Sequence, residues 1–371
     1  MNLADFEIMH PPYHREQEEG MKWLAALHTE AEKTRKPSID PSEFRKIIDQ
    51  KIAKVGCKKD KISRRFTVLK DMMHEEWDQM ELYNIHARGG EGSGFGEKGR
   101  FYETAVDKIF DQFYPEKSLP PDELIHVTCT GYNAPSSPQK LVVRRGWEKT
   151  TQVTHAYHMG CMAAMPAVRI ALGFAARGIR KIDVVHTELC TLHINPVLHT
   201  DEQLVAQSLF SDGMIKYTLT SENENKPQLR VLTVYEELIP NSEKLMKWVC
   251  KDWGMQIALD REIPLYISQS IGDFVKRLEQ KSGHPLQNAI FAIHPGGPKI
   301  VDLIRRKLSL SQQQVATTQK ILYHYGNMSS ATIPHIWEAI LDDAAYCSGT
   351  LIVSLAFGPG LCVCGCVMEK I

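Results

Sequence analysis

Residues 346–368 constrain the fold most, because they carry no charged side chain over a length that could span a bilayer as a helix. The segment is interrupted by Gly349, Gly358, Pro359, Gly360 and Gly365. These residues divide it into two apolar runs, 351–355 and 361–367, joined by a Gly-Pro-Gly turn. The pattern predicts two buried strands and argues against a membrane span.

Three cysteines alternate in the second run. Cys362, Cys364 and Cys366 occupy every second position, so a strand would place them on one face. A zinc site usually has cysteines two residues apart and further Cys or His partners. The histidines between residues 155 and 199 fit no such spacing either. We interpret these cysteines as packing residues and predict no metal site.

Short strand patterns and helix patterns alternate along the chain. Buried strands are predicted at residues 6–9, 124–129, 182–186 and 289–293. Helices are predicted at residues 15–33, 44–65, 100–113, 138–145, 161–177, 298–307 and 333–343. The glycine-rich residues 89–96 lack the Gly-Lys-Ser/Thr ending of a phosphate loop and are predicted to form a surface loop. This order indicates an α/β protein with layered sheets.

Charge and cysteine content limit the partners and the compartment. The 44 Lys and Arg residues nearly balance the 45 Asp and Glu residues, so the whole chain should attract neither nucleic acid nor an anionic membrane. Nine cysteines without the spacing of a small disulfide scaffold favour a reducing compartment. With no signal-peptide pattern at its start, the protein is predicted to be cytoplasmic.

Cys161 lies between Gly160 and an alanine-rich apolar stretch. This arrangement predicts a thiol at a helix N-terminus, where backbone N–H groups and the helix dipole favour the thiolate. Pro166 falls inside that helix and should bend it or loosen its first turns. A cysteine alone at such a point is more often a small core residue, so the prediction depends on partners elsewhere in the chain.

Two glycine-flanked segments supply these partners. His294 begins the sequence His-Pro-Gly-Gly-Pro, and Asn327 follows Gly326 in Tyr-Gly-Asn-Met-Ser-Ser. Glycine lets backbone approach a substrate closely. A thiol, an imidazole and an amide together can form a nucleophile, lower its pKa through an imidazolium, and donate hydrogen bonds to an oxyanion.

These segments, in this order, resemble the active-site signature of the type III polyketide synthases, the chalcone synthase-like enzymes of the thiolase superfamily. Residues 209–213 (Leu-Phe-Ser-Asp-Gly) resemble the LFGDG segment of that family, and residues 357–360 (Phe-Gly-Pro-Gly) resemble its GFGPG loop. The matching pieces extend from about residue 120 to residue 365. The first hundred residues match only loosely.

The resemblance implies a fold and an assembly. It implies a thiolase fold, with two pseudo-symmetric βαβαβαββ halves forming a layered αβαβα core. The N-terminal half, residues 1–222, would carry the nucleophile, and the C-terminal half, residues 223–371, would carry His294 and Asn327, with the break within residues 221–227. Family members are homodimers, so a homodimer is expected.

The resemblance also implies residue roles. Cys161 would take an acyl group from a coenzyme A thioester, and His294 and Asn327 would stabilise the enolate formed when malonyl-CoA loses carbon dioxide. The predicted pocket residues are Phe210, Ile257, His193, Ala134, Phe357, Gly358 and Pro359. Lys59 aligns with a coenzyme A phosphate contact. Coenzyme A thioesters would be substrates, with no tightly bound cofactor.

Ile257 and Ala134 have smaller side chains than the resemblance leads one to expect at these positions, which should enlarge the pocket. His193 should narrow the pocket or make it more polar. A long aliphatic starter is therefore favoured over an aromatic one, with release as a pyrone, a resorcinol or a related product. A single-condensation ketosynthase like the one that initiates fatty acid synthesis remains an alternative, because it shares Cys, His and Asn. A hydroxymethylglutaryl-CoA synthase would need an acidic group near the thiol, and no such motif is evident. A non-catalytic binding module is the structural alternative.

Overall fold

The computed structural model describes residues 1–222 and 226–371. Within this part, nine strands form one sheet in the order β11-β12-β13-β8-β1-β7-β6-β4-β5. Their bounds are β1 Asn2–Met9, β4 Glu123–Thr128, β5 Gln152–Tyr157, β6 Lys181–Glu188, β7 Gly213–Thr220, β8 Leu229–Leu238, β11 Ile290–Ile293, β12 Leu351–Gly358 and β13 Cys362–Lys370. Two smaller antiparallel pairs join β2 (Tyr13–Glu16) with β3 (Arg64–Thr67) and β9 (Met246–Lys251) with β10 (Gly254–Leu259).

The sheet order repeats about its centre. On one side β11 and β12 are parallel, and β13 and β8 follow as antiparallel neighbours. On the other side β4 and β6 are parallel, and β7 and β1 follow in the same antiparallel way. β1 and β8 meet through two residue pairs. This repeat matches the two pseudo-symmetric halves implied by the sequence.

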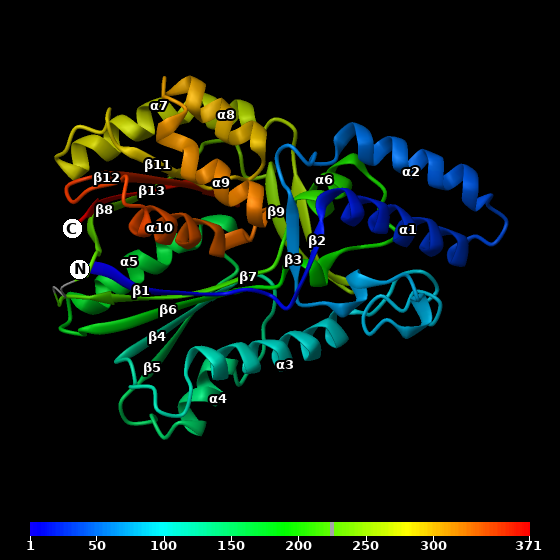
Figure 1. The fold of residues 1–371 in the computed structure, drawn as a ribbon, viewed down its shortest axis with the longest axis horizontal. Helices are drawn as coiled ribbons and strands as arrows, with labels where there is room; N and C mark the ends of the chain where they lie inside the picture. The colour runs from blue at the N-terminus through cyan, green and yellow to red at the C-terminus, as the bar shows by residue number, and fades with distance from the viewer. Residues whose placement is uncertain (223–225) are drawn as a thin grey trace.

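Helices divide the molecule into layers (Figure 1). α7 (Ile263–Ser282) and α8 (Pro298–Lys307) cover the strands of the C-terminal half, and α3 (Phe95–Phe113) and α4 (Ser137–Arg144) lie beyond those of the N-terminal half. α5 (Ala164–Ala175) and α10 (Thr332–Asp342) lie between the two groups of strands. α5 contacts β4, β8 and β13, while α10 contacts β7 and β11, so each buried helix joins both halves.

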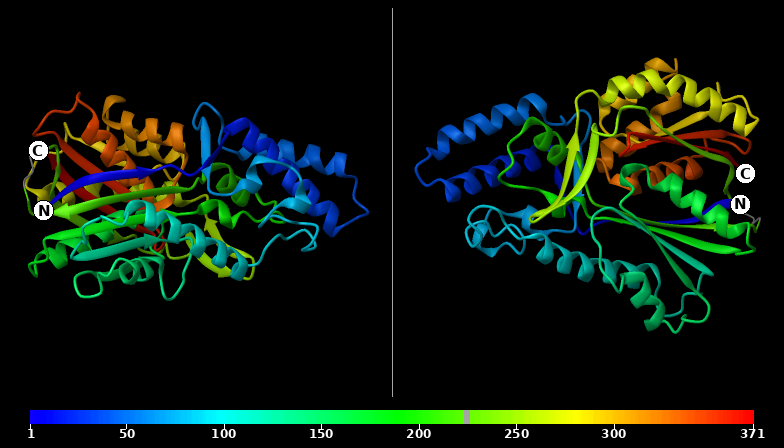
Figure 2. Two further views of the ribbon diagram at one scale, coloured as in Figure 1. Left: turned by 60° about the horizontal axis from the view of Figure 1, so that its bottom comes forward. Right: turned by 180° about the vertical axis from the view of Figure 1, so that it is seen from behind.

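A separate group of elements extends the N-terminal half (Figure 2). It contains α1 (Gln17–Arg35), α2 (Pro41–Val55) and α6 (Asp201–Leu209), while α9 (Ala316–Tyr325) lies near β3. The helix predicted at residues 44–65 is wrong in its second half, because α2 ends at Val55 and the chain then forms β3. Arg65, at the end of that predicted helix, lies instead in β3, where it is buried and donates to the carbonyls of Gln207 (2.5 Å) and Phe210 (3.3 Å).

The other predicted elements are present with some shifted ends, because α3 begins at Phe95, inside the predicted loop at residues 89–96. Residues 351–358 and 362–370 form the antiparallel pair β12 and β13, and no described helix is long and apolar enough to cross a membrane. Residues 89–94 form a loop before α3. The predicted break between the halves includes residues 223–225, which lie outside the described part of the chain.

Candidate active site

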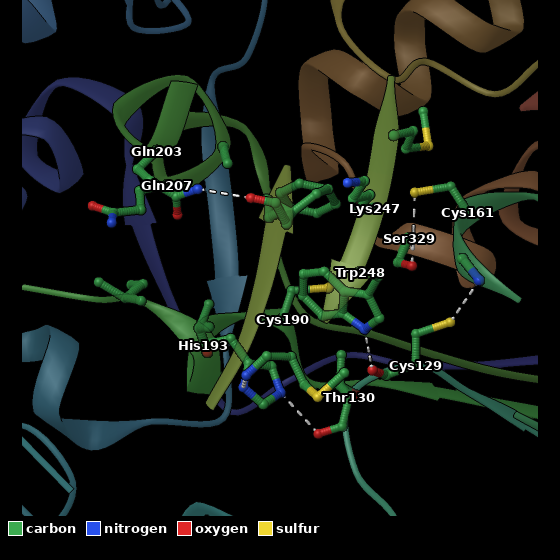
Figure 3. Close-up of a pocket in the computed structure, with 18 of the residues that line it drawn as sticks. Cys129, Thr130, Cys161, Cys190, His193, Gln203, Gln207, Lys247, Trp248 and Ser329 are labelled. Atoms are coloured by element: carbon green, nitrogen blue, oxygen red, sulfur yellow. Dashed lines mark hydrogen bonds between the residues drawn. The ribbon is translucent and has the colours of Figure 1, made fainter. Parts of the chain in front are cut away.

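Three cysteines follow neighbouring parallel strands at the same edge of the sheet. Cys129 follows β4, Cys161 follows β5 and Cys190 follows β6, and β4 pairs in parallel with both other strands. The carboxyl ends of parallel strands are the usual location of ligand sites in α/β proteins. All three cysteines line one pocket (Figure 3).

The pocket has a volume of about 760 Å³, including the part that is open to solvent, and its exposed surface is mostly apolar. The hairpin β9–β10 closes one side, where the Trp248 indole N–H donates to the Cys129 carbonyl at 2.7 Å. α6 forms another side, and Gln203 donates to the Ile257 carbonyl at 2.7 Å. Elements from both halves therefore build the pocket.

Cys161 lies in a 3₁₀ turn, Gly160–Met162, that leads into α5. The Gly160 N–H donates to the Cys129 sulfur at 3.0 Å. Because α5 begins at Ala164, Pro166 falls in the first turn, where its missing N–H removes no helical hydrogen bond. The predicted position of the thiol at a helix start is confirmed, and Pro166 is compatible with that start.

The loop after β12 packs against this turn. Gly160 has a φ of +72°, and a Cβ on it would lie 2.7 Å from the Pro359 Cδ. A Cβ on Gly358 would lie 2.7 Å from the Met162 side chain. These close contacts explain why glycines occupy both positions, and they fix the turn of Cys161 against the C-terminal half.

We expect Gly160→Ala to lower the free energy of unfolding and to reduce activity. Gly146 is a matched control, because it has nearly the same φ of +70° and a Cβ added to it would meet no atom within 4 Å. Gly146→Ala should cost only the backbone strain, roughly 1–2 kcal/mol. Gly160→Ala should cost about 1–3 kcal/mol more through its clash with Pro359. Equal losses in urea unfolding would contradict the proposed packing.

Asn327 and Ser329 lie beside the thiol. The Cys161 sulfur is 3.8 Å from the Ser329 hydroxyl, and Asn327 Oδ1 accepts the Ser329 N–H at 2.9 Å. Burial raises the pKa of the Cys161 thiol, and hydrogen bonding with Ser329 and Asn327 opposes that rise, so the Asn327 side chain lies on the side of Cys161. The structure therefore brings Cys161 and Asn327 together.

His294 follows β11, and its backbone N–H donates to the Leu355 carbonyl of β12 at 2.7 Å. Its imidazole is buried, and neither ring nitrogen has a hydrogen-bond partner among the described residues. Leaving a buried polar group unpaired costs about 1–3 kcal/mol, which makes such a group a candidate for contact with a substrate. His294 lies at the end of the β11–β12 pair, whose Gly358 contacts the Cys161 turn.

Burial opposes the predicted lowering of the Cys161 pKa. Removal from water raises the pKa of Cys161 to about 12 and lowers the pKa of His294 to about 3. Each group alone is thus neutral, and these shifts oppose the thiolate and imidazolium pair that the sequence led us to expect. Transfer of the thiol proton to the imidazole, which the resemblance implies, would leave no net charge in the site, so the two groups would have to ionise together.

We expect His294→Ala to slow alkylation of Cys161 by iodoacetamide at pH 7. Without the imidazole, the thiol loses the proton acceptor that the resemblance implies, and burial, the largest influence, keeps the pKa of the thiol high. Below that pKa the rate should rise about tenfold per pH unit, because only the thiolate reacts. The wild-type rate should level off at a lower pH. Identical pH profiles, measured by mass spectrometry of the Cys161 peptide, would contradict the pairing.

A carboxyl group near the thiol escaped sequence analysis. Glu188 ends β6, is fully buried, and accepts the Cys129 N–H at 3.0 Å and the Ser330 hydroxyl. Burial raises the pKa of Glu188 to about 7, and its charge raises the pKa of Cys161. The only sequence signal for Glu188 is its position at the end of a predicted strand.

Four of the predicted pocket residues line the pocket: Phe210, Ile257, His193 and Pro359. His193 does so with both ring nitrogens occupied. Its Nε2 contacts the Thr130 carbonyl at 2.9 Å, and its Nδ1 accepts the Met255 N–H at 3.1 Å. Burial lowers the pKa of His193 to about 3. His193 therefore narrows the pocket as a neutral side chain, and its ring nitrogens are not free to polarise a substrate.

The remaining predicted residues differ in position. Phe357 is packed in the hydrophobic core and Gly358 contacts Met162, so neither is a lining residue. Ala134 is exposed and lies outside the lining in this chain. Lys59 is exposed and pairs with Glu18 at 2.8 Å.

Sequence analysis also missed other lining residues, among them Cys129, Cys190, Gln203, Trp248 and Ser329. Cys129 and Ser329 could have been found, because one ends a predicted strand and the other follows Asn327 by two positions. Trp248 could not, because the hairpin that carries it has no clear sequence pattern.

The sequence of this chain matches known proteins. Residues 230–371 match the C-terminal domain of chalcone and stilbene synthases. Probable polyketide synthase 1 of Dictyostelium discoideum is 33% identical over 259 residues, which is 67% of this chain and 8% of that protein. The chain therefore spans a small part of the length of this relative.

Solved structures share the whole fold. The C-terminal type III polyketide synthase domain of Steely1, a type I/III hybrid from Dictyostelium, has a TM-score of 0.82 at 23% identity, with 100% of this chain and 99% of that chain covered. PKS-I from the brown alga Ectocarpus siliculosus has a TM-score of 0.82 at 19% identity, with 100% of this chain and 99% of that chain covered. 1,3,6,8-Tetrahydroxynaphthalene synthase from Streptomyces coelicolor A3(2) has a TM-score of 0.79 at 20% identity, again with 100% of this chain and 99% of that chain covered.

The structural matches confirm the predicted thiolase fold, which the repeat of the two halves and the buried pair α5 and α10 show independently. The sequence matches confirm the resemblance to type III polyketide synthases on which the residue roles rest. Residues 230–371 are thus similar to the C-terminal domain of the chalcone and stilbene synthases.

Proposed function

We propose that this chain is a type III polyketide synthase that extends an acyl starter with malonyl-CoA. The observation that carries the proposal is the position of Cys161 at the start of α5, in an apolar pocket and beside the Asn327 amide. The unpartnered imidazole of His294 and the match of residues 230–371 support it.

Loading requires a nucleophile that can also leave. In the proposed step, the Cys161 proton passes to His294 and the sulfur attacks the thioester carbonyl of an acyl-CoA. A new C–S bond forms, the bond to coenzyme A breaks, and the departing thiolate takes the proton from His294. The acyl group is then held on Cys161 inside the pocket.

Extension requires an oxyanion site. Malonyl-CoA loses carbon dioxide, and the electron pair of the broken C–C bond forms an enolate. Asn327 and His294 can donate hydrogen bonds to the enolate oxygen, each worth about 3 kcal/mol. The enolate carbon attacks the acyl carbonyl and releases Cys161, giving a coenzyme A thioester that is two carbons longer. Repeated extension and cyclisation would release a pyrone, a resorcinol or a related product.

The shape of the pocket favours a long aliphatic starter, because Ile257 contributes a side chain of moderate size to an apolar lining. We expect Ile257→Trp to reduce kcat/KM for a long-chain acyl-CoA by at least about tenfold, since filling an apolar pocket discriminates by size. Acetyl-CoA serves as the control substrate, and its kcat/KM should fall much less in the same variant. Equal losses for both starters would place Ile257 outside the starter path.

Two further parts of the proposal rest on the resemblance. Lys59 would contact the coenzyme A phosphates, exchanging its exposed pair with Glu18 for a stronger anion. The active form would be a homodimer, in which the exposed Ala134 faces the partner.

The proposal is tested by incubating the protein with short, long and aromatic acyl-CoAs and measuring its intact mass. At least one starter should add its acyl mass to the chain. If no starter is retained and malonyl-CoA is not consumed, the chain would be a binding module.

A further inference from the structure

Four possible metal ligands meet on the face of the sheet that α5 covers. Cys364 of β13 pairs directly with Glu236 of β8 in the antiparallel register, so their side chains share this face. Cys362 lies two positions along the same strand. Met162 approaches from the turn that carries Cys161, because Gly358 leaves room for its side chain.

The ligand atoms are close together. The sulfurs of Cys362 and Cys364 are 3.7 Å apart, and the Cys364 sulfur lies 3.5 Å from Glu236 Oε2 and 3.5 Å from the Met162 sulfur. The ligand atoms of Cys362, Cys364 and Glu236 all lie within 4.8 Å of one another. Both cysteines are buried and neither forms a disulfide.

The distances from the Cys364 sulfur to the Cys362 sulfur and to Glu236 Oε2 are those of a tetrahedral site. Zinc binds thiolate at about 2.3 Å and carboxylate at about 2.0–2.2 Å. Two sulfurs at tetrahedral positions are then about 3.8 Å apart, and a sulfur and an oxygen about 3.5–3.6 Å apart. One ion could therefore contact Cys362, Cys364 and Glu236 with little movement of the backbone.

The surroundings also suit a cation bound by thiolates. Arg169 of α5 pairs with Glu236 Oε2 at 2.6 Å and can hold the carboxylate in position, as residues around metal ligands commonly do. Two thiolates, one carboxylate, Arg169 and a divalent ion sum to zero charge. The Glu236 side chain is 35% exposed, so an ion could enter from solvent at this side.

We propose that Cys362, Cys364 and Glu236 form a binding site for Zn²⁺, with the Met162 thioether at the fourth position. This site lies outside the catalytic pocket and is independent of the proposed function. The sequence alone indicated that the alternating cysteines are packing residues, because it showed no further ligands near them. In the structure, Glu236 and Met162 lie beside Cys364 and can serve as these ligands. A bound ion would tie the turn of Cys161 to β13.

The test uses the full chain, stripped with a chelator and titrated with Zn²⁺ and, separately, with Co²⁺. The wild type should bind one zinc ion per chain at this site and show thiolate-to-cobalt charge-transfer absorption. The double variant Cys362→Ala, Cys364→Ala should abolish that absorption and weaken zinc binding by at least about 100-fold. Loss of a residue that only supports a metal ligand already weakens binding by about 10- to 100-fold, and loss of two ligands should weaken it more. Cys366→Ala is the matched control, because Cys366 lies on the same strand outside the cluster, and should bind as wild type does.

A second variant keeps the core intact. Glu236→Gln alters a partly exposed side chain, should fold normally, and should weaken zinc binding while shifting the cobalt spectrum. The proposal is overturned if the wild type shows no charge-transfer band, if the double variant binds as tightly as Cys366→Ala, or if Glu236→Gln changes nothing. A Cys362–Cys364 disulfide in the purified protein, found by peptide mass under reducing and non-reducing conditions, would also overturn it.

Discussion

Cys161→Ala is expected to abolish covalent loading, with no acyl mass added to the intact chain after exposure to acyl-CoA. The substitution removes the sulfur and leaves a small apolar side chain at the start of α5, so the fold should persist. Product formation should fall by a factor on the order of 10⁶, the scale on which loss of a catalytic nucleophile acts.

Cys190→Ala is the matched control, because Cys190 is a second thiol in the same pocket. Burial raises the pKa of Cys190 well above its usual range. No described hydrogen bond links its sulfur to Asn327, so it should remain unacylated in the wild type. Loading that survives in Cys161→Ala and disappears in Cys190→Ala would move the nucleophile to Cys190.

Asn327→Ala should retain loading and lose decarboxylation. The amide cannot accept the thiol proton, so its expected role is to donate to the enolate oxygen. Removing one such donor should reduce carbon dioxide release and product by a factor of order 10² to 10³. His294→Ala should impair both steps, because the imidazole takes part in each. The two steps are measured separately, by intact mass and by release of labelled carbon dioxide.

Asn327 also has a structural contact, which a second variant separates from its chemistry. Asn327→Asp keeps the oxygen that accepts the Ser329 N–H but removes the donor. It should therefore lose decarboxylation as severely as Asn327→Ala. If Asn327→Asp were active, or if Asn327→Ala blocked loading as strongly as decarboxylation with its circular dichroism unchanged, Asn327 would orient the nucleophile turn instead.

Much of the fold follows from local sequence patterns. The strands β12 and β13 are predictable because their apolar runs are broken by a Gly-Pro-Gly turn, and α8 is predicted with both of its ends. The prediction of a helix at residues 44–65 extends too far, because β3 is polar and is stabilised by pairing with β2 and by the buried Arg65, which are long-range contacts.

The site is predictable where residues lie in compact motifs. Cys161, Phe210 and Pro359 can be assigned to one pocket because their motifs resemble those of the type III polyketide synthases, and all three line it. The ionisation of Cys161 cannot be predicted in this way, because the pKa of its thiol depends on burial by both halves of the chain. Glu188 and Trp248 also depend on the packing of distant elements, β6 against the turn at residues 329–331 and β9 against the loop after β4.

The most direct test of repeated extension uses malonyl-CoA labelled in its free carboxyl group, together with the starter that loads Cys161. We predict that labelled carbon dioxide is released once for each malonyl-CoA consumed, and that the product contains more than one added two-carbon unit. A product with a single added unit under excess malonyl-CoA would identify a single-condensation ketosynthase, and no release of carbon dioxide with any starter would contradict the account altogether.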